Sequence, residues 1–345
     1  MAEAARQVGE PDAAPRRRRS VPEVWINGVL GVLLLAWPLA AVAFGEPWYA
    51  SLAAKATILA LAGVGLNLAL GFGGMVSLGH GAFFGIGGYV AAVAANAALT
   101  AEPALGWPIA LPGTDQMPPV WLAAVLIAAL IALPIGLISL RTDGVYFIMI
   151  TLAFAQMIYY AAISWPGYGG EDGLPIYLRN GFPGLDTNDP LAFALLCQAV
   201  LAAALLICWA VRRSRFGLAL ACARMNPGRL ASLGIAPMPV KLVAFVISGA
   251  ITALAGALYA DLNGYVSPSM LSWQTSGEIL VFVILGGTGR LFGPVAGAIL
   301  FLVLETLIGG WTEHWKIGLG LAILAVVLYA RGGVIGLFAG PARHG

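Results

Sequence analysis

Long apolar runs separated by short polar segments fill the chain from residue 24 to residue 331. A helix needs about 20 apolar residues to cross the hydrocarbon core of a bilayer. The runs therefore predict an all-α, polytopic transmembrane helix bundle with about ten spans. These spans are expected at residues 24–44, 52–72, 76–98, 120–140, 143–164, 191–211, 241–262, 272–288, 293–309 and 316–331.

Composition agrees with this pattern. Hydrophobic residues make up 60% of the 345 residues and charged residues only 10%, against about 25% charged in an ordinary soluble domain. A water-soluble fold is therefore excluded. The third expected span has a polar, glycine-rich start, and the eighth and ninth are closely spaced, so re-entrant segments remain possible in both places.

The basic residues indicate an orientation. If ten spans alternate across the membrane, one side receives most of the cations and the other keeps only Lys55, Arg179 and Lys316. Because cytosolic loops carry the excess of lysine and arginine, both termini are expected in the cytosol. Residues 1–23 are then a disordered, basic cytosolic tail, 24–331 the transmembrane domain and 332–345 a second cytosolic tail. The cations on the cytosolic side are Arg16–Arg19, Arg141, Arg212, Arg213, Arg215, Arg224, Arg229, Lys241, Arg290, Arg331 and Arg343.

Two loops carry further information. The stretch 165–190 is rich in Gly, Pro and Asp, which predicts an ordered, turn-rich cap or docking surface, although an unstructured connector is a close alternative. The basic loop at 212–240 predicts short helices on the cytosolic side. That pattern fits a protein partner and anionic lipid headgroups equally well. The pattern rests on Phe216, Leu220, Ala223, Leu230 and Leu233 among basic residues.

No motif for bond-making chemistry is present. The chain lacks G-x-x-x-x-G-K-[ST], and LGGTGRLFG at 285–293 has no lysine, so it is interpreted as a tight turn between two spans. The sequence also has no HExxH or GxSxG pattern. We therefore expect no ATPase site of its own, no catalytic residue, no cofactor, no metal site and no nucleic-acid partner.

Glycine and a few polar residues mark the spans. GAFFG at 81–85 and GPVAG at 293–297 are small-xxx-small patterns that let helix backbones approach closely. Polar side chains inside a membrane are costly and usually face a bundle interior or a wet cavity. A substrate pathway is the functional interpretation, and interhelical hydrogen bonding is the structural one. The candidate pathway residues are Asn67, Ser77, His80, Thr151 and Glu278.

Several stretches together resemble one family. GLNLALGFGGMVSLGHGAFFGIGGYVAA (65–92), LRTDGVYFIMITLAFAQMI (140–158), SRFGLALACARMNPGRLASLGI (214–235) and the segment 264–301 are similar to permease subunits of branched-chain amino-acid ATP-binding-cassette (ABC) importers of the LivM type. The resemblance implies a cytosolic coupling loop that docks on an ATPase. The family often has acidic residues around 225–228, whereas this chain has Met-Asn-Pro-Gly there. The residues that match the coupling loop are Arg215, Phe216, Gly217, Arg224, Asn226, Ala231, Leu233 and Gly234.

The resemblance also implies partners and a mechanism. Two cytosolic P-loop ATPase subunits, a second related permease subunit and a periplasmic or extracellular substrate-binding protein would complete the importer in a bacterial inner membrane, in contact with lipid. The permease would move branched-chain amino acids by alternating access. Urea or short-amide import is the alternative within the family. A stand-alone secondary transporter is a further alternative, and its ion-coupled transport would survive ATP depletion.

Overall fold

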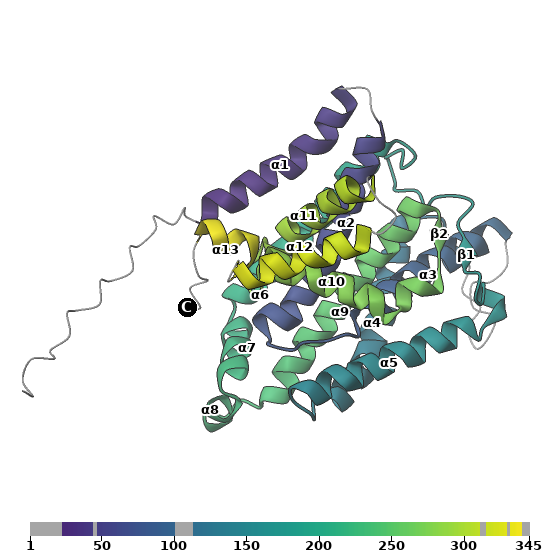
Figure 1. Cartoon of the computed structure of the whole chain (residues 1–345). Coiled ribbons are helices and arrows are strands. Elements are labelled where there is room, and N and C mark those ends of the chain that lie inside the picture. The colour runs from purple at the N-terminus through teal and green to yellow at the C-terminus, as the bar shows by residue number, and fades with distance from the viewer. Residues whose placement is uncertain (1–22, 44–46, 101–112, 311–314, 330–331, 340–345) are drawn as a thin grey trace, which may run out of the picture.

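A computed structural model describes residues 23–43, 47–100, 113–310, 315–329 and 332–339 (Figure 1). Each expected span contains a helix in the described part of the chain, which confirms the helical bundle. The predicted tail at 1–23 lies, except for Glu23, outside the described residues. The long helices are α1 (Glu23–Ala43), α2 (Pro47–Asn67), α3 (His80–Thr100), α4 (Met117–Ser139), α5 (Val145–Ile163), α6 (Pro190–Arg213), α9 (Pro237–Asn263), α10 (Trp273–Gly286), α11 (Gly293–Gly309) and α12 (Trp315–Tyr329).

Helix length separates these elements into two groups. Within the described ranges, six helices are at least 18 residues long and apolar enough to cross a membrane, and they contain α2 to α6 and α9. The apolar stretch of α1 and the helices α10 and α11 are shorter. The count of ten spans therefore stays a prediction.

Short elements connect the long helices. The loop expected to hold short helices contains α7 (Arg215–Met225) and α8 (Pro227–Ser232), which confirms that expectation. A short helix, α13 (Gly333–Ala339), lies within the predicted C-terminal tail. The remaining short elements are the π-helix η1 (Leu68–Phe72), the 3-10 helices η2 (Pro166–Tyr168) and η3 (Pro268–Leu271), and the strands β1 (Leu174–Pro175) and β2 (Tyr265–Val266).

The two ends of the bundle differ (Figure 1). One end carries β1 and β2, and the other carries α7, α8 and α13. Helix α1 begins beside α13, at the α7–α8 end. We call these the β1–β2 end and the α7–α8 end.

The segment 165–190 is ordered at the β1–β2 end. Strand β1 pairs antiparallel with β2, with Leu174 opposite Val266. The backbone N–H of Met117 donates to the carbonyl of Gly181 at 2.8 Å, which ties the segment to the start of α4. An unstructured connector is therefore wrong for this region, and the prediction of an ordered cap is confirmed.

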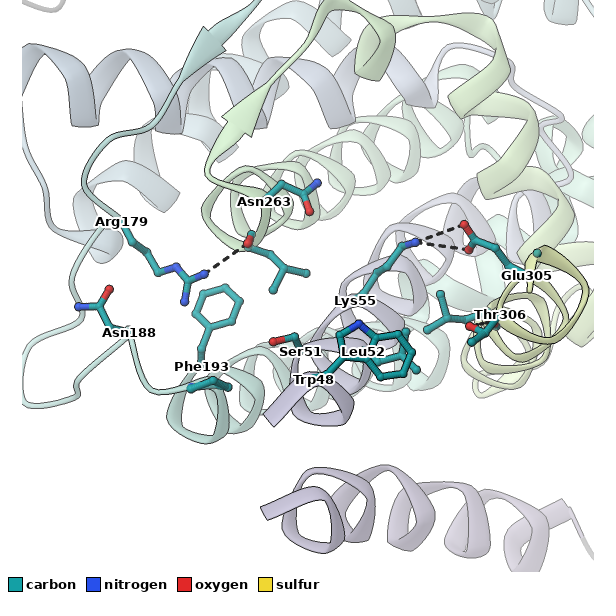
Figure 2. Close-up of a pocket in the computed structure, with 14 residues that line it drawn as sticks. Trp48, Ser51, Leu52, Lys55, Arg179, Asn188, Phe193, Asn263, Glu305 and Thr306 are labelled. Atoms are coloured by element: carbon teal, nitrogen blue, oxygen red, sulfur yellow. Dashed lines mark hydrogen bonds and ion pairs between the residues drawn. The ribbon is translucent and has the colours of Figure 1, made fainter. Parts of the chain in front are cut away.

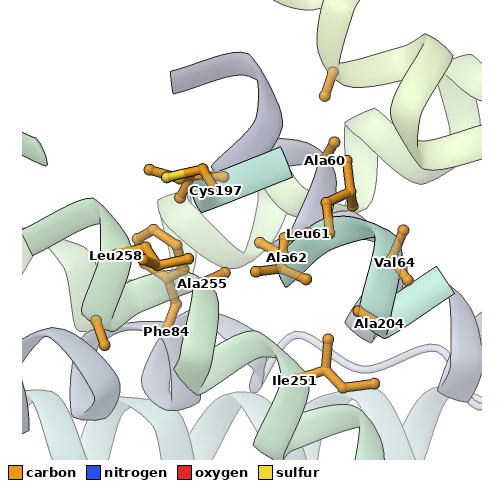
Figure 3. Close-up of a cluster of buried hydrophobic side chains, with 14 of the residues drawn as sticks. Ala60, Leu61, Ala62, Val64, Phe84, Cys197, Ala204, Ile251, Ala255 and Leu258 are labelled. Atoms are coloured by element: carbon orange, nitrogen blue, oxygen red, sulfur yellow. The ribbon is translucent and has the colours of Figure 1, made fainter. Parts of the chain in front are cut away.

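Small residues build the core around α2 and α9 (Figure 3). A Cβ placed on Gly256 of α9 would collide with the carbonyl oxygen of Phe84 on α3, and one on Gly297 of α11 would collide with that of Phe282 on α10. The predicted close approach of helix backbones is thus confirmed at GAFFG and GPVAG. Cluster residues shown in Figure 3 are Ala60, Leu61, Ala62, Val64, Phe84, Cys197, Ala204, Ile251, Ala255 and Leu258.

Candidate functional site

The chain is broken between α2 and α3. Helix α2 continues into the π-helix η1, after which residues 73–79 form a loop. Gly74 in this loop has φ +70, a left-handed conformation that glycine adopts without steric cost. Helix α3 begins only at His80, so the expected start at residue 76 is wrong. The glycine-rich segment is a helix interruption, with polar residues on both of its sides.

A second interruption lies against the first. Between β2 and α10 the chain runs along α3, where Gly81, Gly85 and Gly88 face it. A Cβ on Gly85 would collide with Leu271, and one on Gly81 would crowd Ser276. The backbone N–H of Gly81 also donates to Ser276 Oγ at 2.8 Å. The first turns of α3 and α10 therefore meet, an arrangement of discontinuous helices that lines binding sites in membrane transporters.

His80 is the first residue of α3 and is fully buried. Its Nε2 lies 2.7 Å from Ser248 Oγ on α9, and Ser248 donates its hydroxyl hydrogen to the carbonyl of Gly65 at 2.6 Å. Because a hydroxyl has one hydrogen, Ser248 accepts from His80, and Nε2 carries the imidazole proton. Nδ1 has no hydrogen-bond partner among the described residues. His80 thus links α3 to α9 and α2.

Ser77 and Thr151 hold the loop that precedes α3. Ser77 Oγ accepts from the backbone N–H of Gly79 at 3.1 Å. Thr151 Oγ1, on α5, accepts from the backbone N–H of Leu78 at 3.4 Å and donates to the carbonyl of Ile148 at 3.0 Å. Both side chains are buried. Together with His80, they fix the start of α3 relative to α5 and α9.

Asn67 is the last residue of α2 and contacts a different segment. Its side-chain amide donates to the carbonyl of Arg290 at 2.8 Å and accepts from the backbone N–H of Gly289 at 3.0 Å. These residues belong to the turn between α10 and α11, where Gly287 and Gly289 have positive φ. The prediction of a tight turn at 285–293 is therefore confirmed, and Asn67 clamps it to α2.

Glu278 is separate from the other candidates and lines a cavity. This exposed residue of α10 borders a space of about 760 Å³ near β2 and η3. The walls combine hydroxyl, amide and phenol groups with apolar side chains. Of the five candidates, the fold thus gathers Ser77, His80 and Thr151, attaches Asn67 to the neighbouring turn and leaves Glu278 open to the cavity. The other lining residues are Leu59, Phe84, Tyr159, Tyr259, Asn263, Tyr265, Ser267, Ser269, Met270, Ser272, Gln274, Thr275, Ile279 and Phe282.

Helices α7 and α8 form a second candidate site. Ser214 caps α7 by accepting from the backbone N–H of Gly217 at 3.2 Å, and Asn226 caps α8 by accepting from that of Arg229 at 3.0 Å. Leu220, Ala223 and Leu230 are buried. The opposite surface is open: Met225 and Leu233 are each 74% exposed.

Most of the remaining residues of the predicted coupling loop are exposed. Leu233 is therefore on the outer side of the α7–α8 pair rather than on the packed side with Leu220. Gly217 is half-buried against the end of α6, where a Cβ would collide with the carbonyl of Val211. Phe216 is half-buried, and Arg215, Arg224, Asn226, Ala231 and Gly234 are exposed.

Arg224 connects the two candidate sites. Its guanidinium donates through Nη1 to the carbonyl of Gly71 in η1, and its aliphatic stem covers Gly74. A charge-assisted hydrogen bond of this kind is stronger than a neutral one. Helix α7 is thus attached directly to the interruption that precedes α3.

Sequence reasoning missed several residues that organise these sites. Ser248 and Ser276 form the bonds described above, but isolated serines in apolar helices give no sequence signal. Asp261 does give one, because it is a charged residue inside an expected span. It is fully buried on α9, where Asn180 donates to its Oδ1 at 2.7 Å.

Comparison with known proteins identifies the family. A family model described as "Branched-chain amino acid transport system / permease component" matches residues 48–331. The chain is 28% identical over 328 residues to the high-affinity branched-chain amino acid transport system permease protein LivM of Escherichia coli K12, covering 88% of this chain and 73% of that protein. It is 23% identical over 287 residues to the LivH permease protein of the same strain, covering 80% and 91%.

A relative that belongs to a different transport system also matches. The autoinducer 2 import system permease protein LsrC of Enterobacter sp. strain 638 is 28% identical over 209 residues, which is 58% of each chain. No solved structure gives a significant match. The apolar helices and these relatives make the chain a multi-pass protein of the inner membrane. The chain belongs to the family of branched-chain amino acid transport system permease components.

Proposed function

We propose that the chain is the transmembrane subunit of an ABC importer and moves branched-chain amino acids such as leucine, isoleucine and valine. The observation that carries the proposal is the family match over residues 48–331. A periplasmic binding protein would deliver the substrate to the β1–β2 end, at 165–190 and 263–276. The chain would hydrolyse no ATP itself.

The ATPase would bind at α7 and α8. Large exposed apolar side chains favour a protein partner, and Met225 and Leu233 are each 74% exposed. Movement of α7 would reach η1 through the bond between Arg224 and Gly71. Because η1 leads into the loop before α3, a shift there would alter how the first turns of α3 and α10 meet.

A second, related permease subunit would cover α5. Only 17% of the most apolar stretch of this helix is buried within the chain, and its exposed residues include Tyr146, Met149 and Tyr160. The cavity beside Glu278 includes Tyr159 of α5 and is open. The proposed pathway therefore lies between the two permease subunits, where alternating access would open the cavity to each side in turn.

The cavity suits an aliphatic amino acid. A carboxylate at Glu278 can pair with the substrate ammonium, while Leu59, Met270 and Ile279 provide an apolar wall. Urea carries neither a charge nor an aliphatic chain. We assign a positioning role to Asn67, Ser77, His80 and Thr151, because each is buried and bonded to backbone or to Ser248.

The test is reconstitution of the whole importer in proteoliposomes with its ATPase subunits, its second permease and its binding protein. We expect ATP-dependent uptake of leucine and none of urea. Glu278→Gln should reduce leucine uptake, whereas Asp143→Asn, an exposed carboxylate outside the cavity and outside the segments assigned to the partners, should leave it unchanged. ATP-dependent uptake of urea without leucine would contradict the substrate, and uptake that persists without ATP would contradict the transporter class.

A further inference from the structure

A second cavity, of about 590 Å³, lies at the β1–β2 end (Figure 2). It is bordered by α2, α6, the end of α9 and α11, and it shares Asn263 with the cavity beside Glu278. Trp48 lies at the start of α2, and tryptophan is enriched where a membrane meets water. Lys55 follows seven residues later, about 10 Å further along the helix. The cavity thus runs along about the first two turns of α2, from Trp48 to Lys55.

One wall presents a fixed cation. The Arg179 guanidinium donates to the carbonyls of Asp261 at 2.9 Å, Thr187 at 2.8 Å and Leu262 at 3.3 Å. It also stacks 4.7 Å from the ring centre of Phe193. A guanidinium has five N–H donors, so these three bonds leave two for another acceptor. Arg179 is therefore held in place with donors left for an anionic group.

The opposite wall presents an ion pair between Lys55 and Glu305, and its carboxylate can still accept another hydrogen bond. Lys55 Nζ lies 3.4 Å from both carboxylate oxygens of Glu305, which is longer than the roughly 2.8 Å of a tight charge-assisted hydrogen bond. The side chains of Lys55 and Glu305 are 31% and 27% exposed. Figure 2 shows this pair on the other side of the space from Arg179 and Phe193. Glu305 can therefore accept from a second cation while it faces Lys55.

This layout is complementary to a ligand that carries both charges. Arg179 and Lys55 favour a negative group, Glu305 favours a positive one, and a simple cation would be repelled by both basic residues. A zwitterion satisfies both walls. Leu52 and Leu302 add apolar surface between the charged groups.

We propose that this cavity binds a zwitterion in which a phosphate or carboxylate faces Arg179 and a primary ammonium faces Glu305. Two sources supply this chemistry: the headgroup of phosphatidylethanolamine and a free α-amino acid. The proposal concerns binding alone and does not rest on the proposed transport function. Glycerol and choline headgroups lack a primary ammonium, so they provide the contrast.

The experiment uses the purified full chain in its complex, placed in nanodiscs. In the lipid arm, the nanodiscs contain equal amounts of phosphatidylethanolamine, phosphatidylglycerol and phosphatidylcholine with identical acyl chains, and native mass spectrometry counts the lipids that stay bound. In the amino-acid arm, nanodiscs of phosphatidylcholine alone are titrated with radiolabelled leucine. Both arms compare the wild type with Glu305→Gln, Arg179→Gln and Ser51→Trp, which fills the cavity without changing its charge.

We expect the wild type to prefer one ligand class by at least about tenfold. Each of the three variants should lose that preference, because a hydrogen bond to a charged group is worth about that factor. Asp143→Asn, which lies outside the cavity, is the matched control and should keep wild-type binding. Thermal unfolding of each variant separates lost binding from lost folding, and Ser51→Trp keeps all three charges in place. Retention of phosphatidylethanolamine identifies the lipid source, and binding of leucine identifies the amino acid. No preference in either arm, or a preference that survives Ser51→Trp, overturns the proposal.

Discussion

Helices α2 and α5 are both long and apolar, yet they occupy opposite environments. The most apolar stretch of the helix that contains α2 is 83% buried within the chain, and that of α5 is 17% buried. Helix α2 packs against α1, α6, α9, α10 and α11, whereas α5 contacts α3, α4, α10 and η3 on one side. Hydropathy alone does not separate a central helix from a peripheral one.

Residue size explains the difference. Helix α2 is rich in alanine and glycine, so that neighbouring backbones approach it from all sides, as at Gly63 and Gly65. Helix α5 contains large residues such as Tyr146, Met149 and Met157, and these are exposed. Without water to drive association, close backbone packing holds membrane helices together. Small residues therefore mark the helix that organises one chain, and large exposed ones mark a surface left for lipid or a partner.

The largest effect is expected from placing a large side chain on the closely packed helix α2. Gly65→Leu on α2 should abolish most of the folded protein, because even a Cβ at Gly65 would collide with Thr252 and crowd the carbonyl of Ser248. Overpacking costs about 1–3 kcal/mol or more. Met157→Leu on α5 is the matched control and should behave as wild type. Folded yield on size-exclusion chromatography measures both, and equal yields would contradict the packing account.

The next largest effect is expected from breaking the bond through which movement of α7 would reach η1. Arg224→Ala removes the bond to Gly71 and should lower ATP-dependent uptake at least about tenfold, while ATP hydrolysis continues in the assembled complex. Arg212→Ala, an exposed arginine at the same end, is the control. Uptake and hydrolysis are measured on the same proteoliposomes. Wild-type coupling in Arg224→Ala would show that movement enters by another route.

The exposed side of α5 can be probed by cross-linking. In a Cys222→Ser background, Met157→Cys labelled with a benzophenone maleimide should photo-cross-link to the second permease subunit. Leu35 on α1 is 56% exposed, and Leu35→Cys should not form this cross-link. Ala60→Cys on α2 should stay unreactive, because Ala60 is fully buried. A partner cross-link from α1 and none from α5 would place the interface elsewhere.

The smallest effect is expected from removing the Ser248 hydroxyl, which takes part in two hydrogen bonds. Ser248→Ala leaves His80 Nε2 without its acceptor and should lower the free energy of unfolding by about 1–3 kcal/mol, the cost of an unsatisfied buried donor. Tyr146→Phe on α5 should have no effect, because Tyr146 is 72% exposed. Chemical denaturation in detergent measures both. Equal stabilities would mean that His80 finds another partner.

The helices could be predicted from the sequence because hydropathy and length are local properties. The two short helices of the basic loop and the turn at 285–293 could be predicted for the same reason. The start of α3 could not, because it depends on contacts with Thr151 and Ser276 from distant segments. The positions of Asn67 and His80 depend on hydrogen-bond partners far away along the chain. Asp261 could be recognised as a charged residue inside a span. Its partner Asn180 could not, because it comes from a distant loop.

The central claim is that this chain is a transmembrane subunit driven from α7 and α8 by a separate ATPase. The most direct test is leucine uptake into proteoliposomes that contain the two permease subunits, with binding protein and ATP, measured with and without the ATPase subunits. The account predicts uptake only when the ATPase subunits are present. Equal uptake in their absence would contradict it.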